Sequence, residues 1–261
     1  IVPADYADQA TAPVGTGPFK FVSRSVQESM VVEKFAEYWG TPAYLDKVTF
    51  KIFEDPNALM SALSAGSVDM ANHLTIDQVD AIGGDFNCLE GTMNLVQALY
   101  LNNAVEPFNN VKVRQAISYA IDRQALLSGC YNGFGTAVTL PAIPSSPFYD
   151  LTLARQVSFD PTKLQEALAE SSLTGRTVKL LVNKTDSVRL QAARKIGQML
   201  TDCGLVVEML EHNYTDYRAV LRDGNFDLYL GQTKLSANMD LTPFFSANGA
   251  LNYGEIDDIA V

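Results

Sequence analysis

The second half of the chain alternates short apolar runs with amphipathic segments, and this alternation limits the possible fold more than any other feature. Asp186 or Ser187 is placed to cap one amphipathic segment, and Gly204 is placed to end it. Strand, helix, strand, helix, strand at this spacing is typical of βαβ crossovers. The sequence therefore predicts an α/β fold with these elements: strand 177–182, helix 188–203, strand 205–210, helix 215–222 and strand 226–230.

The first hundred residues show shorter patterns behind a lead-in, 1–16, that has no periodicity. Polar residues between two β-rich runs favour a hairpin, and Pro56 and Gly66 bracket a helix. The later part of this region should contribute strands to a mixed sheet. The predicted strands are 19–23, 30–35, 48–53, 68–71, 86–90 and 95–102, and the predicted helices are 56–66 and 75–82.

Three further segments follow the predicted strand 95–102. Residues 111–128 carry apolar side chains at helical spacing, which predicts one long helix. Residues 129–160 are rich in proline and glycine and should form a long irregular excursion. Residues 161–170 should form a helix with Asp160 as its N-cap.

Composition excludes several classes of protein. The 261 residues are 47% hydrophobic, which is enough to build a globular core rather than a disordered chain. The 19 basic and 30 acidic residues give a net charge of -11, and such a surface repels the phosphates of nucleic acids. No apolar run approaches the roughly 18 residues that a membrane-spanning helix needs.

The residues that usually carry metal or thiol chemistry are few and scattered. Cys88, Cys130 and Cys203 lack the C-x-x-C spacing, so we expect all three to be small buried apolar residues, with one disulfide or a nucleophilic thiol as the alternatives. His73 and His212 lie far from one another and from any cysteine. The sequence therefore predicts no metal site and no cofactor.

Motifs of nucleophilic and nucleotide chemistry are also absent from the sequence. Gly15-Thr16-Gly17 is followed by Pro18, and Lys20 stands where a dinucleotide loop would have its third glycine. No G-x-S-x-G or P-loop motif occurs, and Ser128 has no histidine nearby. Catalysis is therefore not indicated.

A series of motifs in order gives the chain a family resemblance. Val113–Arg123 is similar to the signature segment of oligopeptide, dipeptide and nickel binders. The series as a whole resembles the family 5 extracellular solute-binding proteins and covers nearly the whole chain. Its other members are Gly15-Thr16-Gly17-Pro18-Phe19, Tyr38-Trp39-Gly40, Ala65-Gly66-Ser67-Val68-Asp69, Leu101-Asn102-Asn103, Asp160-Pro161, Gly204-Leu205 and Gly224-Asn225-Phe226-Asp227.

The resemblance implies a two-lobed fold like that of periplasmic binding proteins, of type II and similar to cluster C. Residues 1–100 would form part of the first lobe, residues 101–261 an incomplete second lobe, and 100–103 one crossing strand. Family chains are considerably longer, so the resemblance implies a partial chain whose cleft lacks one wall.

The resemblance also implies ligand contacts. In peptide binders, the segment after Phe226-Asp227 brings an aromatic residue and an aspartate to the cleft, where the aspartate meets the peptide amine. Here Asn238 occupies the aspartate position, so Asp240 either takes that role or caps a following helix. The implied contact residues are Tyr100, Asn102, Gln232, Lys234, Asn238 and Asp240.

The function implied by the resemblance is that of an extracytoplasmic solute-binding subunit of an ABC transporter. Such a subunit, a monomer, would capture oligopeptides or dipeptides by hinge closure and pass them to permease subunits. It would be periplasmic, or a lipoprotein on the cell surface. Alternatives are a nickel complex, a sugar or another solute in the same fold, a sensor domain, and a hydrolase or transferase using residues 129–160 over a cleft.

Overall fold

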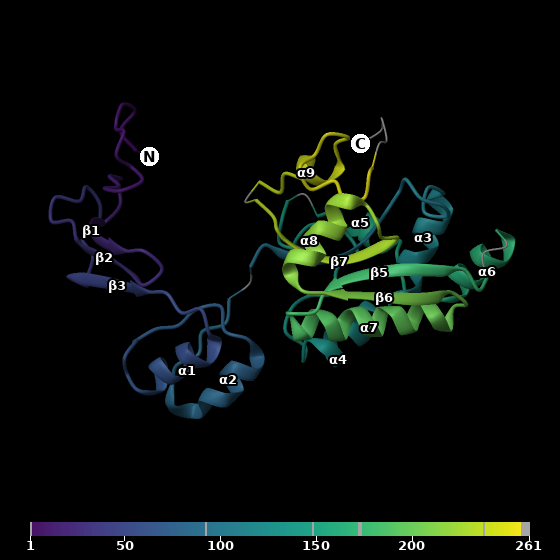
Figure 1. Ribbon diagram of the computed structural model, residues 1–261, viewed down its shortest axis with the longest axis horizontal. Helices are drawn as coiled ribbons and strands as arrows, with labels where there is room; N and C mark the ends of the chain where they lie inside the picture. Colours follow the sequence, from purple (N-terminus) through teal and green to yellow (C-terminus); the bar gives the residue numbers. More distant parts are fainter. Residues whose placement is uncertain (1, 92, 148, 172–173, 237, 257–261) are drawn as a thin grey trace. The chain divides into compact units, whose positions relative to one another are not determined.

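The structure, a computed structural model, describes residues 2–91, 93–147, 149–171, 174–236 and 238–256 (Figure 1). The chain divides into two units, residues 1–90 and residues 91–261. None of the helices within the described ranges has the length and apolar character needed to cross a membrane.

The first unit contains an antiparallel sheet and a helical segment. The predicted hairpin, the third strand and both helices are confirmed, and Lys20 and Glu33 form an ion pair across neighbouring strands at 3.0 Å. Asp55 caps the first helix and Thr75 the second. The elements are β1 (Phe19–Ser25), β2 (Ser29–Lys34), β3 (Lys47–Lys51), α1 (Pro56–Ser64), α2 (Ile76–Ile82) and the short 3-10 helix η1 (Gly83–Asp85), with sheet order β1-β2-β3.

Two strands predicted in this region are wrong. Residues 68–71 and 86–90 have no strand structure. Met70 is 80% exposed and Leu89 is 96% exposed, so these short runs bury little apolar surface. A strand needs a partner for its backbone groups, and local apolar character alone does not supply one.

The second unit is built on a mixed four-stranded sheet with the order β4-β7-β5-β6. Strand β5 pairs in parallel with β6 and β7, whereas β4 pairs with β7 antiparallel. This confirms the predicted α/β class and the βαβ crossovers. The elements of the sheet and its connections are β4 (Leu95–Leu101), β5 (Thr177–Asn183), α7 (Ser187–Asp202), β6 (Val206–His212), α8 (Tyr214–Asp223) and β7 (Leu228–Lys234).

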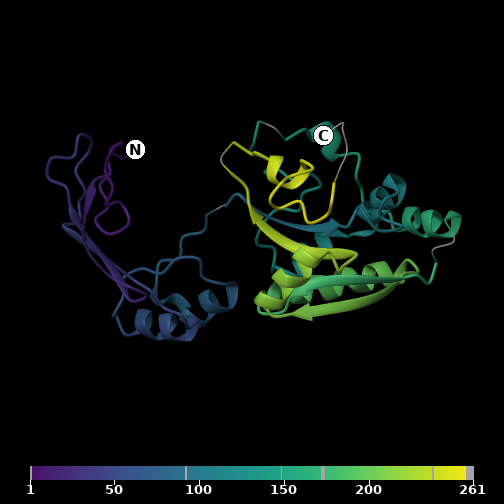
Figure 2. The same ribbon diagram turned by 45° about the horizontal axis from the view of Figure 1, so that its top comes forward.

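Helices cover both faces of this sheet (Figures 1 and 2). Helix α7 packs on one face, and α8 packs on the other. Leu180, Val182 and Leu228 belong to the larger core on the α7 side, and Leu181 and Tyr229 belong to the smaller core on the α8 side. Because successive strand residues point to opposite faces, neighbours in sequence separate into the two cores.

The long helix predicted over 111–128 is instead two helices, α3 (Val111–Ala120) and α4 (Arg123–Cys130). Ile121 and Asp122 adopt extended backbone angles between them. The Asp122 side chain accepts a hydrogen bond from the Ala125 backbone N–H at 2.9 Å. A side chain that caps α4 therefore starts a new helix inside the apolar pattern.

The described residues within 131–147 and 149–160 are irregular except for α5 (Leu151–Ala154), in keeping with their proline and glycine content. The following helix α6 (Thr162–Glu170) begins one residue later than predicted, with Pro161 as its N-cap. Asp160, the predicted N-cap, still accepts a hydrogen bond from the Thr162 backbone N–H at 3.2 Å. A further short helix, α9 (Thr242–Phe245), follows β7.

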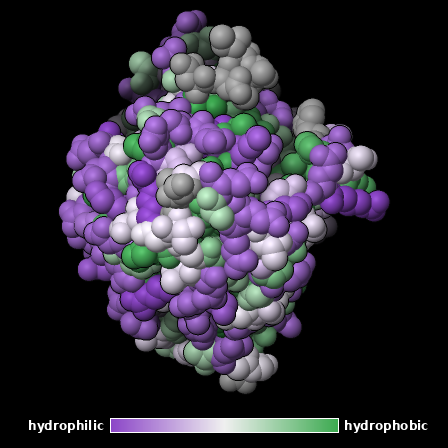
Figure 3. Space-filling model, turned by 90° about the vertical axis from the view of Figure 1, so that its right-hand side faces the viewer, coloured by the Kyte–Doolittle hydropathy of each residue, from purple (hydrophilic) through white to green (hydrophobic). Residues whose placement is uncertain are grey.

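The cysteines do not all behave as predicted. Cys130 and Cys203 are buried, but Cys88 is exposed, because it lies in the segment that does not form the expected strand. All three thiols are free. On the face drawn in Figure 3, hydrophilic residues predominate and hydrophobic atoms form small separate patches.

Candidate ligand-binding site

A cavity of about 120 Å³ lies on the α8 side of the second unit's sheet, where β7 continues past the end of β5. In sheets with parallel strands, ligands bind outside the carboxyl ends of the strands. The residues that line the cavity come from β4, β7, α7, α8 and the segment around α9: Tyr100, Arg189, Tyr214, Tyr217, Arg218, Leu221, Tyr229, Gly231, Gln232, Thr233, Phe244, Leu251 and Tyr253.

Stacked tyrosines form the floor of this cavity, which we call the tyrosine cavity. Tyr100 and Tyr229 are paired residues of β4 and β7, and their ring centroids are 4.5 Å apart with an interplanar angle of 4°. Gly231, the next residue on the same face, leaves room for them, because a Cβ there would lie 2.8 Å from the Tyr229 ring. Any larger residue at position 231 would collide with the stacked rings of Tyr100 and Tyr229.

Burial keeps these phenols protonated. It raises the pKa of Tyr217 to about 12, and it also raises the pKa values of Tyr229 and Tyr100. The Tyr217 hydroxyl donates a hydrogen bond to the Leu230 carbonyl oxygen at 3.4 Å. At neutral pH the cavity thus presents uncharged hydroxyl groups and aromatic faces.

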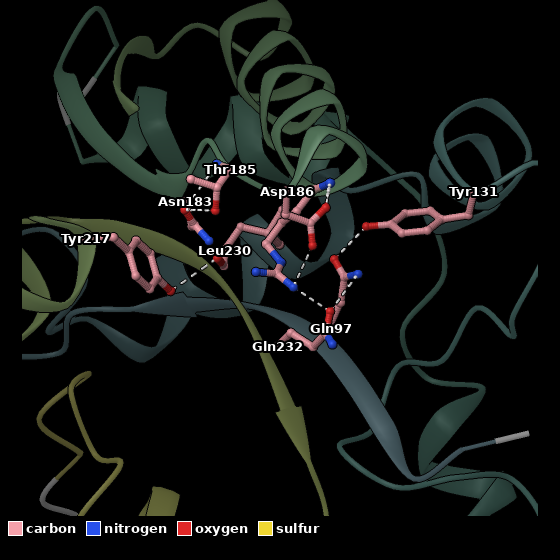
Figure 4. A network of polar contacts seen from close by, with 9 residues as sticks. Gln97, Tyr131, Asn183, Thr185, Asp186, Tyr217, Leu230 and Gln232 are labelled. Atoms are coloured by element: carbon pink, nitrogen blue, oxygen red, sulfur yellow. Dashed lines mark hydrogen bonds and ion pairs between the residues drawn. The ribbon is translucent and has the colours of Figure 1, made fainter. Parts of the chain in front are cut away.

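A polar network connects two lining residues of the cavity, Arg189 and Gln232, to Asp186, Gln97 and Tyr131 (Figure 4). The Nη2 atom of Arg189 lies 2.9 Å from a carboxylate oxygen of Asp186 and also donates to Gln232 Oε1. Gln97 donates to the same Gln232 oxygen at 3.4 Å, and its own Oε1 accepts from the Tyr131 hydroxyl at 2.6 Å. The network links the start of α7 to β4, β7 and the end of α4.

The guanidinium of Arg189 is not fully satisfied by this network. Its side chain is only 13% exposed, and its Nε atom is buried without a hydrogen-bond partner among the described residues. The second arginine, Arg218, lies with its Cζ atom 5.9 Å from the centre of the Tyr253 ring. In the described part of the chain no carboxylate lines the cavity, so its wall carries positive charge.

The structure brings two of the six predicted ligand contacts to the cavity, Tyr100 and Gln232. Asn102 is buried instead beside the turn before β7. Its amide nitrogen donates to the carbonyl oxygens of Gly224 and Phe226 at 3.3 and 3.0 Å, and its oxygen accepts from the Ala104 N–H at 3.1 Å. The amide is thereby used in holding two segments of the fold together.

The other three predicted contacts lie along the chain after the cavity strand. Lys234 ends β7 and is exposed, and Asn238 is also exposed. Asp240 accepts a hydrogen bond from the Thr242 backbone N–H at 3.0 Å, and its hydrogen bonds with Thr242 lower its pKa. The structure does not place these three side chains in the lining of the tyrosine cavity.

Several lining residues were not anticipated from the sequence, above all Arg189, Arg218, Tyr217 and Tyr229. One signal was available for Arg189, because it lies in the first turn of the helix after a predicted parallel strand, where ligands commonly bind. Tyr217 and Arg218 could not be found in this way, since their approach to β7 depends on the order of strands in the sheet.

The described residues do not gather potential metal ligands into a site. They contain no cluster of three or more His, Cys, Asp or Glu side chains arranged to hold a metal ion. The arrangement supplies aromatic faces, hydroxyl and amide groups and two guanidinium groups around a small open space, which suits the capture of part of a solute.

Comparison with known proteins decides the family. The family of bacterial extracellular solute-binding proteins, family 5 Middle, matches residues 2–254. The chain belongs to this family. As a family 5 protein, it has the fold implied by its motifs: the substrate-binding protein CtaP of an ABC transporter from Listeria monocytogenes superposes with a TM-score of 0.84 over 98% of this chain and 54% of that one, at 20% identity.

Other family 5 relatives are named by what they bind. The glutathione-binding protein GsiB of Pectobacterium atrosepticum is 30% identical over 202 residues, 76% of this chain and 39% of that protein. The periplasmic binding protein DppA of Helicobacter pylori, solved with the peptide STSA, has a TM-score of 0.72 and 24% identity over 95% of this chain and 50% of that one. The chain therefore spans about two fifths of that curated relative and about half of the solved chains.

Proposed function

We propose that this chain is part of the extracytoplasmic solute-binding subunit of an ABC transporter, and that the subunit captures oligopeptides or dipeptides. The observation that carries the proposal is the tyrosine cavity, an open space beyond the end of a parallel strand, and membership of a solute-binding family supports its assignment as the solute site. The solved relative DppA, which holds a peptide, supports the choice of peptides.

The proposed mechanism is capture by closure of two lobes around the solute. Residues 1–100 belong to the first lobe and residues 101–261 to the second, with residues 100–103 crossing between them. A solute that contacts both lobes binds the closed form better and shifts the population toward it. The permease subunits then recognise the closed form, so solute binding is converted into a signal for transport.

Tyr100, at the start of the crossing segment, and Gln232, in the second lobe, contact the solute directly. Lys234, Asn238 and Asp240 follow on the same segment and meet the solute outside the tyrosine cavity. Asn102 acts on the site by fixing the strand ends through its hydrogen bonds to Gly224 and Phe226. Neutral phenols and amides of this kind suit a ligand with many main-chain polar groups.

The subunit binds and does not catalyse, acts as a monomer and has no nucleic-acid partner. It works outside the cytoplasm, either in the periplasm or as a lipoprotein held at the cell surface. The strongly acidic composition, with a net charge of -11, supports the absence of nucleic-acid binding.

The test is to incubate the complete gene product with a pool of dipeptides to pentapeptides and to record native mass spectra. Separate samples contain a nickel–histidine complex and a set of simple sugars. Retention of peptide masses from the pool is the expected result. Retention of only the nickel complex or a sugar would overturn the peptide assignment and favour those solutes, and hydrolysis of the peptides would overturn the assignment as a non-enzyme.

A further inference from the structure

The wall of the tyrosine cavity carries positive charge from two arginines. The family resemblance instead implies an aspartate that meets the amine of a peptide, so the proposed function does not explain these arginines. Building on the proposed function, we propose that the cavity takes an anionic group of the solute, a carboxylate, between the guanidinium groups of Arg189 and Arg218, with an apolar or aromatic part of the solute against the tyrosine rings.

The hydrogen-bond donors of Arg189 give the first support for an anionic ligand group. A guanidinium carries five N–H donors, and the Nη2 atom of Arg189 already serves Asp186 and Gln232. Its Nε donor is buried with no hydrogen-bond partner in the described part of the chain. A charged donor left unpaired in a buried place is costly, so the Arg189 guanidinium carries an electrostatic demand that its protein partners do not fully meet, and a nearby anion would reduce it.

The charge balance of the cavity wall is the second support. Arg189 and Arg218 contribute two positive charges, and Asp186, which pairs with Arg189, contributes one negative charge. Among the described residues that line the space, none is acidic. This positive site lies in a chain with a net charge of -11, so it is a local arrangement rather than a property of the whole surface.

The tyrosines contribute aromatic surface rather than charge. Tyr217 lines the same cavity as Arg189 and Arg218, and burial raises its pKa to about 12, so its phenol is uncharged at neutral pH. Its single O–H is already donated to the Leu230 carbonyl oxygen, so this phenol offers the solute aromatic surface rather than a further donor. Arg218 also lies over the Tyr253 ring, and this contact limits the positions its guanidinium can take.

The size of the space limits how much of the solute it holds. The cavity measures about 120 Å³, below the roughly 300–1,000 Å³ of a pocket that encloses a whole small molecule. It therefore accommodates one end or one side chain of the solute. A carboxylate next to an aromatic or branched apolar carbon skeleton matches both the arginines and the tyrosine floor.

Saturation-transfer NMR with the 261-residue chain tests the charge preference with three small probes of nearly equal shape. N-acetylphenylalanine is anionic, N-acetylphenylalanine amide is neutral and phenylalanine amide is cationic. We expect the anionic probe to bind at least about tenfold more tightly than the neutral one, because a charge-assisted pair is stronger than a neutral hydrogen bond. Equal binding of the three probes would overturn the inference.

Arginine variants test whether the preference for the anionic probe arises in the tyrosine cavity. Arg189→Gln and Arg218→Gln should each remove most of the preference for the anionic probe. Arg189→Lys, which keeps the charge but loses the planar fork, should recover only part of it. The matched control is Arg222→Gln, since Arg222 is exposed on the same helix as Arg218 and does not line the cavity. An equal loss in this control would show that net charge, and not the cavity, produces the preference.

A parallel measurement separates this inference from the proposed function. The complete gene product is titrated with one tripeptide that has a free carboxyl end, with its C-terminal amide, and with an amidated tripeptide bearing a glutamate side chain. Preference for either acidic form supports the inference and identifies which carboxylate is read. Equal binding of all three keeps the peptide function and overturns the inference. If the anionic small probe binds but none of the peptides does, the inference stands and the peptide function is overturned.

Discussion

At the scale of single residues, Gly231 decides whether the two central tyrosines can stack. We predict that Gly231→Ala lowers the free energy of unfolding by about 1–3 kcal/mol, as is usual when extra volume is forced into a packed site. A Cβ at this position would lie 2.8 Å from the Tyr229 ring and 3.2 Å from the Tyr100 ring. Urea unfolding measures the change, and near-ultraviolet circular dichroism should show the altered tyrosine environment.

Gly129 offers a matched control for this substitution. It lies inside α4, and a Cβ added to it would meet no atom within 4 Å. Because alanine favours a helix by roughly 1 kcal/mol over glycine, Gly129→Ala should leave stability unchanged or raise it. If both substitutions have the same effect, the tight packing at Gly231 is not the cause of the loss.

The buried phenols give a second prediction at this scale, a loss of stability at alkaline pH. Burial raises the folded-state pKa of Tyr131 and Tyr217 to about 12, whereas a tyrosine in the unfolded chain titrates near 10. A raised folded pKa stabilises the folded state below pH 10, and this contribution is lost as the pH rises through about 10 to 12. Urea unfolding between pH 8 and pH 11 should show the decline, and spectrophotometric titration of tyrosinate should show a late fraction. Ionisation of all tyrosines near pH 10 would contradict it.

Asn102 gives a third prediction, because its amide joins the end of β4 to the turn before β7. Asn102→Ala removes a donor to the Gly224 and Phe226 carbonyl groups and leaves them unpaired in a buried place. We expect a loss of about 2 kcal/mol or more in the free energy of unfolding. Thermal and urea unfolding check this, with Asn103→Ala as a neighbouring comparison. An unchanged midpoint for Asn102→Ala would show that these hydrogen bonds add nothing to stability.

At this scale the sequence anticipated only part of the candidate site. Tyr100 and Gln232 follow from the family motifs, but Arg189, Tyr217 and Arg218 do not. These side chains meet because β7, the last strand among the described residues, inserts between β4 and β5. Strand order within a sheet is a tertiary property, so local patterns do not reveal which distant residues become neighbours.

At the scale of elements, the patterns predicted the second unit's sheet and helices well because the signals there are local. Alternating or continuous apolar runs define β5, β6 and β7, and capping residues mark the start of α7. The failures occurred where the deciding interaction is not a periodicity. The strands predicted at 68–71 and 86–90 lacked partners, and the helix predicted over 111–128 is divided by a capping aspartate.

The division between α3 and α4 can be tested through that cap. We predict that Asp122→Ala lowers the free energy of unfolding by about 1 kcal/mol, because the backbone N–H of Ala125 loses its acceptor. Asp122→Asn should retain most of the stability, since asparagine caps helices nearly as well. Chemical unfolding of both variants provides the measurement. Equal losses would mean that the charge of Asp122, rather than its capping hydrogen bond, matters.

At the scale of the whole molecule, the two units differ in how much core they contain. Within the described residues of the first unit, Leu63 is the single buried hydrophobic residue, whereas the second unit holds two buried clusters. Backbone amides exchange slowly only where packing opposes opening. We therefore expect hydrogen exchange measured by mass spectrometry to be markedly faster in residues 1–90 than in β5, α7 and β7. Similar protection in both units would contradict this.

Capture of a solute is the activity proposed for this family 5 protein. The most direct measurement is native mass spectrometry of the complete gene product, purified gently from cells, with any bound species released and sequenced. We predict that the protein carries peptides, and that these are enriched in an acidic group next to an aromatic or branched residue. A protein that is empty on purification and that also retains nothing from a supplied peptide pool would contradict the account.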